Sequence, residues 1–344
     1  MEYARLGKTG LSVSRICLGM MSFGSADWQP WVLPGDEGES FVRAALDRGI
    51  NFFDTADFYS MGLSEEVLGA AVDRLTDRRQ VVLATKVGLP LGQMGPGGPA
   101  PNDGGLSRKH IFAAVDESLR RLKTDYIDLY QLHRPDPATP IEETVDALND
   151  LVRSGKVLYV GATNYATWQL AKAVYDGRFR AGIDFSAVQV QYNLVYREDA
   201  RDLIPFCEAE GIGCLGYSPL ARGWLAGIRG DGATVSEREA RRATGDAKAH
   251  SLYGTEADRL TLDRLGEIAA ARGVSPAEVA YAWILSHRFM ASVICGPLEL
   301  SHLDSAVASL DIRLTDAERD ALDAAYEPRA VKDDAFGAVA GQRR

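Results

Sequence analysis

Short runs of β-branched and other apolar residues alternate along the chain with longer stretches in which apolar residues recur every three or four positions. The short runs have the length of strands, and the longer stretches have the period of helices that bury one face. Regular alternation of the two predicts repeated βα units around a parallel sheet. The expected strands are Ile16–Met20, Asn51–Thr55, Val81–Val87, Ile127–His133, Val157–Thr163, Ala187–Tyr192, Gly213–Tyr217 and Ser292–Cys295.

The stretches between these strands predict helices, and several of them begin with capping residues. Ser64 is followed by acidic residues, and Ser275 is followed by a proline and, three positions on, by Glu278. The helical stretches are Glu37–Asp47, Ser64–Arg74, Ser107–Arg121, Pro140–Ser154, Thr167–Tyr175, Arg197–Ala209 and Glu256–Ala271. Eight consecutive βα units predict an α/β fold, the (β/α)8 TIM barrel.

Three kinds of segment depart from this rhythm. Residues 1–15, with two glycines between extended stretches, predict an N-terminal hairpin that covers the bottom of the barrel. Gly88–Gly105 is rich in glycine and proline, and Ala221–Gly254 is long and charged. We interpret both as long loops on the catalytic face, without packed elements, and 221–254 as the loop on the cofactor side. No low-complexity linker divides the chain, so we expect one domain over 1–344 that ends in a tail from 327.

The composition agrees with a globular enzyme and disfavours some partners. The 344 residues are 46% hydrophobic and 25% charged, and the formal net charge is −10. This charge argues against a nucleic-acid or anionic-membrane partner, since both favour a basic surface. The four cysteines are scattered in apolar runs, which predicts buried free thiols. The chain shows neither a targeting segment nor a membrane-length run, so a cytoplasmic protein is expected, and no pattern specifies its oligomeric state.

Reactive side chains follow three consecutive strands. Asp54 ends the second strand and Tyr59 comes shortly after it, Lys86 lies near the end of the third, and His133 ends the fourth. The carboxyl ends of barrel strands meet on one face, so these four groups should lie together. An ammonium beside Tyr59 would lower the pKa of the phenol from about 10, Asp54 could hold Lys86, and His133 could bind a substrate oxygen or relay a proton. This set predicts hydride transfer coupled to proton transfer.

Each of these side chains also has an ordinary structural interpretation when taken alone. A tyrosine after a strand often packs at an interface, an aspartate often caps a helix, and a histidine is often structural. A barrel glycosidase that uses Asp54 and Asp57 is an alternative function. The two carboxylates are close in sequence, however, and no second strand ends in a carboxylate suited to that role.

The same motifs resemble those of the aldo-keto reductases over nearly the whole chain. The matching segments are Gly49-Ile-Asn-Phe-Phe-Asp-Thr-Ala-Asp-Phe-Tyr59, Ala84-Thr-Lys86, Asp125–Asp136, Gly155–Gly161, Gln189-Val-Gln-Tyr-Asn193 and Gly216–Gly223. The chain is most similar to the branch that includes aryl-alcohol dehydrogenase-like enzymes and potassium-channel β-subunits. The resemblance implies reversible NAD(P)H-dependent reduction of an aldehyde or ketone, a small-molecule substrate. It also leaves open a cofactor-sensing regulatory subunit as the alternative.

The resemblance implies roles for individual residues. Tyr59 matches the general acid/base, supported by Asp54, Lys86 and His133, and no metal site is implied. Tyr217 matches the aromatic ring that stacks on the nicotinamide. The other implied cofactor contacts are Thr163, Asn164 and Gln189 at the nicotinamide amide, Ser218, Leu220, Arg222 and Gly223 at the pyrophosphate, and Gly296 and His302 at the adenosine phosphate.

The cofactor and the substrate are less sharply predicted. The family default is NADP, but Gly296–Ala306 carries no arginine or lysine to hold a 2′-phosphate, so NAD is a possible cofactor. Arg134 could bind an anionic substrate group. The aromatic residues near strand ends could hold an apolar carbonyl compound or could simply pack in loops: Trp28, Trp31, Phe58, Tyr192 and Trp224.

Overall fold

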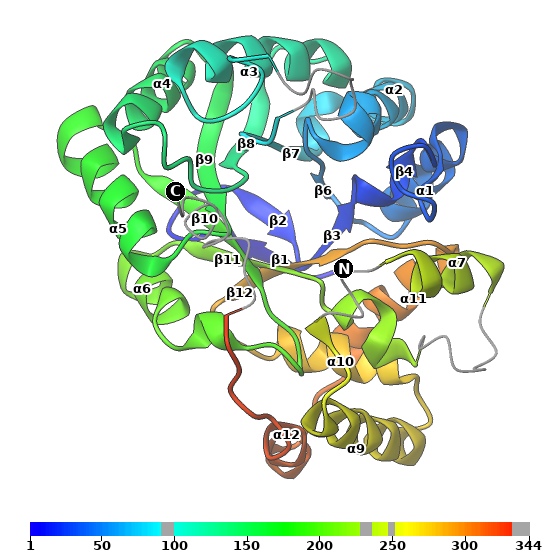
Figure 1. Cartoon of the computed structure of the whole chain (residues 1–344). Coiled ribbons are helices and arrows are strands. Elements are labelled where there is room, and N and C mark those ends of the chain that lie inside the picture. Colours follow the sequence, from blue (N-terminus) through cyan, green and yellow to red (C-terminus); the bar gives the residue numbers. More distant parts are fainter. Residues whose placement is uncertain (91–99, 228–235, 247–251, 332–344) are drawn as a thin grey trace.

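Eight parallel strands form a closed barrel at the centre of the computed structural model, which describes residues 1–90, 100–227, 236–246 and 252–331 (Figure 1). Each strand pairs with the next along the chain, and the last pairs with the first. The strands are β3 (Ile16–Gly19), β6 (Phe52–Asp54), β7 (Val82–Val87), β8 (Ile127–Leu132), β9 (Val157–Thr163), β10 (Phe185–Gln191), β11 (Gly213–Tyr217) and β12 (Met290–Cys295). The predicted TIM barrel is therefore confirmed, with strand ends within two residues of those expected.

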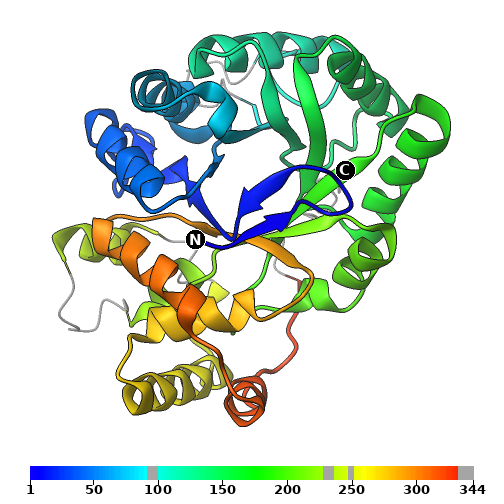
Figure 2. The same ribbon diagram turned by 180° about the vertical axis from the view of Figure 1, so that it is seen from behind.

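Helices surround the barrel in Figures 1 and 2. They are α1 (Gly35–Asp47), α2 (Leu63–Leu75), α3 (Arg108–Leu122), α4 (Ile141–Arg153), α5 (Thr167–Asp176), α6 (Leu203–Glu210), α7 (Glu237–Gly245), α9 (Glu256–Arg272), α10 (Pro276–Leu285), α11 (Leu300–Ala308) and α12 (Asp316–Asp323). Helix α6 begins later than the predicted Arg197, whose guanidinium instead lies 4.4 Å from the ring centroid of Trp283. None of the helices in the described ranges combines the length and apolarity that a bilayer crossing requires.

Helix α7 corrects the prediction that Ala221–Gly254 lacks packed elements. A short helical segment, η7 (Ala221–Ala226), and α7 both form in this stretch, whose residues 228–235 and 247–251 lie outside the described ranges. Ser236 and Glu239 cap α7 reciprocally, and the Arg242 guanidinium lies 4.2 Å from the ring centroid of Trp31. No residue of α7 is fully buried and few of its residues are apolar, so capping and ionic contacts hold this helix. Residues 91–99 of the other predicted loop and 332–344 of the predicted tail are likewise outside the described ranges.

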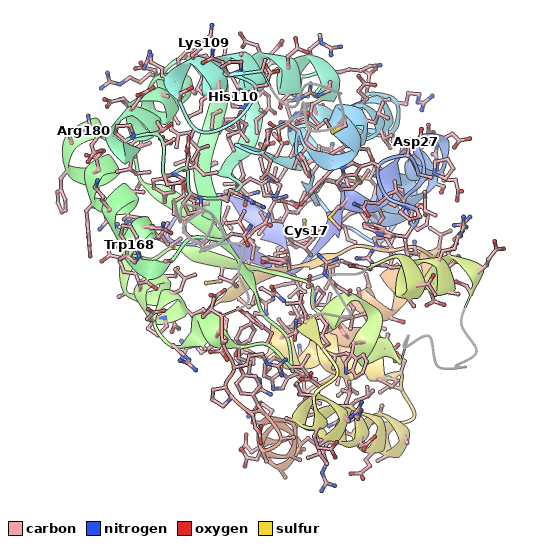
Figure 3. The ribbon with its side chains drawn as sticks, viewed as in Figure 1. Cys17, Asp27, Lys109, His110, Trp168 and Arg180 are labelled. Atoms are coloured by element: carbon pink, nitrogen blue, oxygen red, sulfur yellow. The ribbon has the colours of Figure 1, made fainter. Side chains whose placement is uncertain are left out.

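An antiparallel hairpin, β1 (Tyr3–Arg5) and β2 (Ser12–Ser14), lies across one end of the barrel (Figure 2). Leu6 and Val13 from the hairpin are buried in one cluster with barrel residues such as Phe52 and Leu129. The expected plug at the bottom of the barrel is therefore present. Cys17 belongs to the same cluster and lies within the ring of strands in Figure 3. All four cysteines are buried and free, as predicted.

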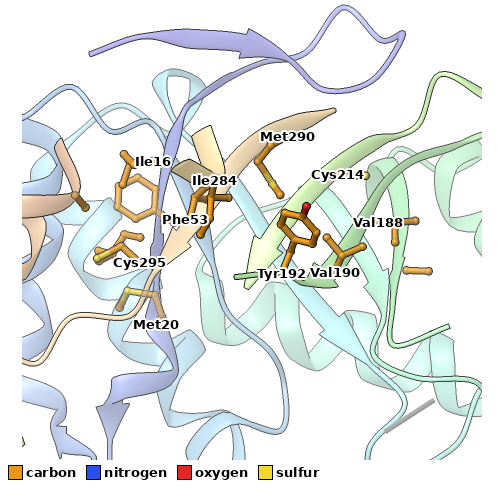
Figure 4. Packing of buried hydrophobic residues seen from close by; sticks show 14 of the residues in the cluster. Ile16, Met20, Phe53, Val188, Val190, Tyr192, Cys214, Ile284, Met290 and Cys295 are labelled. Carbon is orange, nitrogen blue, oxygen red and sulfur yellow. The ribbon is translucent and has the colours of Figure 1, made fainter. Parts of the chain in front are cut away.

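Buried apolar side chains form two layers, one inside the barrel and one between the strands and the helices. Figure 4 shows members of the outer layer, with Ile16, Phe53 and Cys295 gathered on one side. Along β7, Val82 and Ala84 join the inner cluster, whereas Leu83 and Val87 join the outer one. This two-residue period turns Lys86 towards the barrel interior and the preceding residue, Thr85, towards the helices.

Candidate active site

The side chains that point into the barrel are apolar along most of each strand and polar near its carboxyl end. On β6 the buried Phe52 is followed two residues later by Asp54, and on β7 Ala84 is followed by Lys86. In the same way, Gln131, Gln189 and Tyr217 lie two residues after an inward apolar residue, near the carboxyl ends of β8, β10 and β11. The apolar positions fill the lower barrel together with the hairpin, and the polar ones form the floor of a site at the opposite end.

Lys86 is the centre of the polar cluster. Its Nζ lies 2.6 Å from Oδ2 of Asp54, 2.8 Å from the carbonyl oxygen of Thr55 and 3.3 Å from the hydroxyl of Tyr59. The Lys86 and Asp54 side chains are only 1% and 4% exposed. Three donors thus meet three acceptors. The oxygen of Tyr59 accepts from the ammonium, which leaves the phenolic proton available to another acceptor.

The carboxylate of Asp54 is held from both sides. Oδ1 accepts a hydrogen bond from Nε2 of Gln131 at 3.1 Å and another from Nε2 of Gln189. The carboxylate therefore has little freedom to turn away from Lys86. Gln189, which the resemblance assigns to the nicotinamide amide, directs its amide nitrogen at Asp54 in this structure while still lining the cavity.

Burial and charge set the protonation of this cluster. Burial alone would lower the pKa of Lys86, but Asp54 and Tyr59 outweigh it and raise the pKa, so the side chain stays an ammonium. Burial raises the pKa of Tyr59 above its ordinary value, although Lys86 acts in the opposite direction. Lys86 therefore lowers the pKa of the phenol as expected, but the increase caused by burial is larger.

His133 faces Tyr59 as a neutral imidazole. The two ring centroids are 5.8 Å apart with an interplanar angle of 85°. Burial, and then the charges of Lys86 and Arg134, lower the pKa of His133 well below its ordinary value. Its Nδ1 is buried without a hydrogen-bond partner among the described residues. Nδ2 of Asn164 donates to the backbone carbonyl of His133 at 3.0 Å and ties β8 to β9.

Tyr59 begins a strained turn, η2 (Tyr59–Gly62). The φ angles of Ser60, Met61 and Gly62 are 49°, 56° and 92°, so three successive residues adopt the left-handed conformation. For residues other than glycine this conformation costs roughly 1–2 kcal/mol each. Such a turn persists only where its surroundings hold it.

A single cavity of about 450 Å³ brings together every residue that the sequence assigns to catalysis and to cofactor binding. Its lining includes Asp54, Tyr59, Lys86, His133, Thr163, Asn164, Gln189, Tyr217, Ser218, Leu220, Arg222, Gly223, Gly296 and His302. These residues come from six barrel strands or the loops that follow them, and also from the loop after β12 and from helix α11. The cavity therefore extends from the Lys86 cluster to the start of α11.

The middle of the cavity carries groups suited to an amide and an aromatic ring. The Tyr217 hydroxyl donates to Oδ1 of Asn164 at 2.8 Å, and Asn164 has a φ of 60°. The Thr163 hydroxyl oxygen is buried without a partner among the described residues. The next loop has further left-handed residues, Ser218 and Arg222, with φ of 54° and 59°. A buried hydroxyl without a protein partner is available to a bound polar group, such as an amide.

The far end of the cavity differs from the sequence-based expectation. Nε2 of His302 lies 3.0 Å from Oε1 of Glu239, and Nδ1 of His302 accepts from the backbone nitrogen of Leu298 at 3.2 Å. Arg222 and Arg242 also line the cavity, so basic side chains from outside Gly296–Ala306 accompany His302 in its lining. Glu239 and Arg242 are not among the residues predicted for the site, although the pattern Ser236-x-x-Glu239 marks the start of their helix.

The residues considered for substrate binding separate into two groups. Trp28 and Phe58 line the cavity with ring centroids 5.8 Å apart, and Trp28 lies 6.0 Å from the Tyr59 ring. The cavity lining, taken over the described residues, does not include Trp31, Arg134, Tyr192 or Trp224. Tyr192 instead stacks on Trp283 at 5.5 Å, so its role is packing.

Asp57 bears on the glycosidase alternative. Its side chain is fully buried, and it is absent from the cavity lining as far as the structure is described. A pair of carboxylates that acts on one glycosidic bond must face the same cavity. The geometry of Asp54 and Asp57 does not meet this requirement.

The closed parallel barrel and the polar cluster at its carboxyl end define a barrel enzyme. Comparison with protein families makes the class specific, because the model of the aldo/keto reductase family matches residues 15–327. The chain belongs to the aldo/keto reductase family and is therefore an oxidoreductase that acts on carbonyl groups.

Several curated proteins are similar over nearly their whole length. A versiconal hemiacetal acetate reductase from Aspergillus parasiticus is 39% identical, with 96% of this chain and 98% of that protein covered. A protein from Schizosaccharomyces pombe, whose name assigns it to the aryl-alcohol dehydrogenases, is 36% identical, with 96% and 97% covered. An uncharacterized oxidoreductase from Bacillus subtilis is 37% identical, with 91% and 92% covered.

Proposed function

We propose that this chain is a reversible NAD(P)H-dependent reductase that converts an aldehyde or ketone to an alcohol with a proton from Tyr59. The observation that carries the proposal is the hydrogen bond from Lys86 to the oxygen of Tyr59 inside the shared cavity. It orients the phenol as an acid towards the cavity and places a positive charge beside the phenolate that proton donation leaves behind.

The residues along the cavity fit a nicotinamide dinucleotide. When bound, the reduced nicotinamide supplies the hydride. Tyr217 offers its ring to one face of the nicotinamide, with Thr163, Asn164 and Gln189 near the amide. The loop Ser218–Gly223 would border the pyrophosphate, and Gly296 and His302, which line the same cavity, would border the adenosine end. NADP is the family default, whereas the Glu239 carboxylate beside His302 favours NAD, because it would repel a 2′-phosphate.

Four residues, Tyr59, Lys86, Asp54 and His133, have different roles in proton transfer to the carbonyl oxygen. Tyr59 donates its proton to the developing alkoxide, and Lys86 stabilises the resulting phenolate. Asp54 balances the charge of Lys86 and fixes its position. His133 is kept neutral by burial, so it can donate a hydrogen bond that polarises the carbonyl without adding a charge to the site.

The substrate end of the cavity suits an apolar carbonyl compound. Trp28, Phe58, Leu89 and Met21 line it beside Tyr59. Arg134, the candidate for binding an anionic group, is not part of this lining in the described structure. We therefore propose an aldehyde or ketone on an aromatic or other apolar frame as the substrate class.

The test is a panel of aromatic, aliphatic and carboxylate-bearing aldehydes and ketones, with NADPH and NADH oxidation followed separately by absorbance. Tyr59→Phe is the matched control, since it retains the ring and removes only the proton donor. We expect turnover of the apolar carbonyls to fall at least about 10²-fold in kcat, while cofactor binding is kept. Undiminished turnover by Tyr59→Phe would exclude the proposed mechanism.

A further inference from the structure

A buried ionic cluster lies directly behind the active site, between β7 and helices α2 and α3. Thr85 precedes Lys86 and faces the opposite side of the barrel wall. Its hydroxyl donates to Oε1 of Glu65 at 2.6 Å, and Nε of Arg121 donates to Oε2 of the same carboxylate at 2.6 Å. The Glu65 and Arg121 side chains are 0% and 9% exposed.

This cluster also supports the turn that carries Tyr59. Gly62 ends the turn, and a Cβ atom added there would lie 2.8 Å from both Cδ and Nε of Arg121. The Arg121 side chain is therefore packed directly against the backbone of the turn. Glu65 lies in the first turn of α2, which begins at Leu63. A single carboxylate thus connects the strand position next to Lys86 with the arginine beneath the Tyr59 turn.

The turn that carries Tyr59 is strained, so it needs contacts that hold its backbone in place. Ser60 and Met61 are held in the left-handed conformation, which an unsupported turn would leave. The hydrogen bond from Lys86 to Tyr59 is already long, at 3.3 Å, so a small displacement of the turn would break it. The Tyr59–Lys86 contact therefore depends on the atoms that fix the turn relative to β7.

The charges of the cluster favour a positioning role over one in stability. Burial, and then the Glu65 carboxylate, raise the pKa of the neighbouring Asp57 well above its ordinary value, which favours the neutral acid there. Arg121 is thus the cation that compensates Glu65. Buried ion pairs are often no more stabilising than apolar residues of similar volume, whereas removal of one partner is costly. Such a pair contributes more to the fixed positions of its neighbours than to the free energy of unfolding.

We propose that Glu65 and Arg121 are positioning residues that set the contact between Tyr59 and Lys86. The proposal rests on the proposed function in so far as Tyr59 is the proton donor. Their effect passes through the Gly62 backbone on one side and through Thr85 on the other. Neither residue lines the cavity within the described chain.

The experiment compares Glu65→Gln, Arg121→Lys and Thr85→Val with a matched control. Glu65→Gln keeps the shape and removes the charge, and Thr85→Val removes only the hydroxyl donor. The control is Asp128→Asn, which weakens another buried pair on the same barrel wall. There, Asp128 Oδ2 accepts from NH2 of Arg78 at 2.6 Å and from the Leu83 backbone nitrogen at 2.8 Å, near the start of β7.

For Glu65→Gln we expect kcat to fall about tenfold or more, because small misplacements of reacting groups are costly. Substrate KM and cofactor Kd should change by no more than about twofold, since the cavity lining is intact. A weaker contact with Lys86 raises the pKa of Tyr59, so the alkaline fall in kcat should move to higher pH. Arg121→Lys should retain part of the rate, and Asp128→Asn should lower Tm without altering kcat or its pH profile.

A second readout does not depend on activity. Tyrosine labelled with ¹³C at Cζ gives a Tyr59 resonance that can be assigned by its loss in Tyr59→Phe. We expect this resonance to move in Glu65→Gln and Thr85→Val towards its position in Lys86→Met, and to stay unchanged in Asp128→Asn. A moved resonance in a protein without carbonyl reduction would support the inference and overturn the proposed function.

The opposite result has an equally clear meaning. An active enzyme whose Tyr59 resonance and kcat are unaltered in Glu65→Gln and in Thr85→Val would overturn the positioning role and leave the proposed function standing. If Glu65→Gln does not fold, Thr85→Val decides the question, because it keeps the ion pair and removes only the link to β7.

Discussion

The Nζ atom of Lys86 lies 4.8 Å from the ring centroid of Tyr59 and 3.3 Å from its hydroxyl oxygen, so one ammonium faces both the ring and the oxygen of the phenol. The positive charge interacts more strongly with a phenolate than with a phenol. The pair therefore favours proton loss from Tyr59 at the moment when a substrate oxygen needs a proton.

Lys86→Met should reduce carbonyl turnover strongly and displace its pH profile. Reduction requires protonated Tyr59, so the rate falls as pH rises through the pKa of the phenol. Without Lys86 that pKa is higher, and the alkaline fall should occur at higher pH on a much lower plateau. The measurement is kcat for reduction between pH 6 and the alkaline limit of stability.

The same variant should also be less stable, because it leaves Asp54 buried and uncompensated. We expect a loss of about 3–5 kcal/mol in the free energy of unfolding. The double variant Asp54→Asn/Lys86→Met should recover much of this stability but none of the activity, which separates the two effects. Full activity in the double variant would contradict the role of Lys86.

His133→Gln should change the acid dependence of stability. The pKa of His133 is depressed in the folded state, so below about pH 6.5 the unfolded chain binds a proton that the folded chain refuses. Wild type should therefore lose about 1.4 kcal/mol more per pH unit than His133→Gln as pH falls from 6.5 towards the folded-state pKa. Denaturant unfolding at several pH values measures the difference. Parallel curves for the two proteins would show that His133 is not held neutral.

Glu239→Gln should shift cofactor preference towards NADPH. The carboxylate lies beside His302 at the end of the cavity that we propose for the adenosine, where it would disfavour an additional phosphate. Its removal should improve NADPH binding relative to NADH by about fivefold, the equivalent of about 1 kcal/mol for a partly exposed charge interaction. Fluorescence titration with both cofactors measures this ratio.

Trp28→Ala should affect apolar substrates selectively. Trp28 forms a wall of the cavity near Tyr59, so its loss removes contact area from a bulky aromatic carbonyl but not from a small aliphatic one. We expect KM for the aromatic substrate to rise about tenfold, in line with the 1–2 kcal/mol that a buried aromatic contact supplies. An equal change for both substrates would indicate that Trp28 acts on the fold and not on specificity.

The barrel strands could be predicted closely because each strand is bounded by sharp changes in composition. The alternation of inward and outward positions also located Asp54 and Lys86, since a polar residue at an inward position stands out against Phe52 and Ala84. The residues assigned to the cofactor all line the same cavity, because the family motifs that identify them are located at the ends of the strands.

Other features depend on contacts between distant segments and carry little local signal. Helix α7 carries few apolar residues and none that is fully buried, so its cap is its clearest local signal. The Glu65–Arg121 pair joins residues 56 positions apart, and the left-handed conformations of Ser60 and Met61 occur in residue types that usually avoid it. Tertiary packing, and not local preference, decides the ion pair and the left-handed turn.

The hairpin that seals the bottom of the barrel leaves the N-terminus on the face opposite the cavity. Met1 is exposed and lies near Gly49, just before β6 begins, whereas the cavity opens beyond the other ends of the strands. A protein tethered to a solid support through Met1 would therefore keep its entrance directed at the bulk solution. Immobilised preparations attached in this way should retain access for both the cofactor and bulky carbonyl compounds.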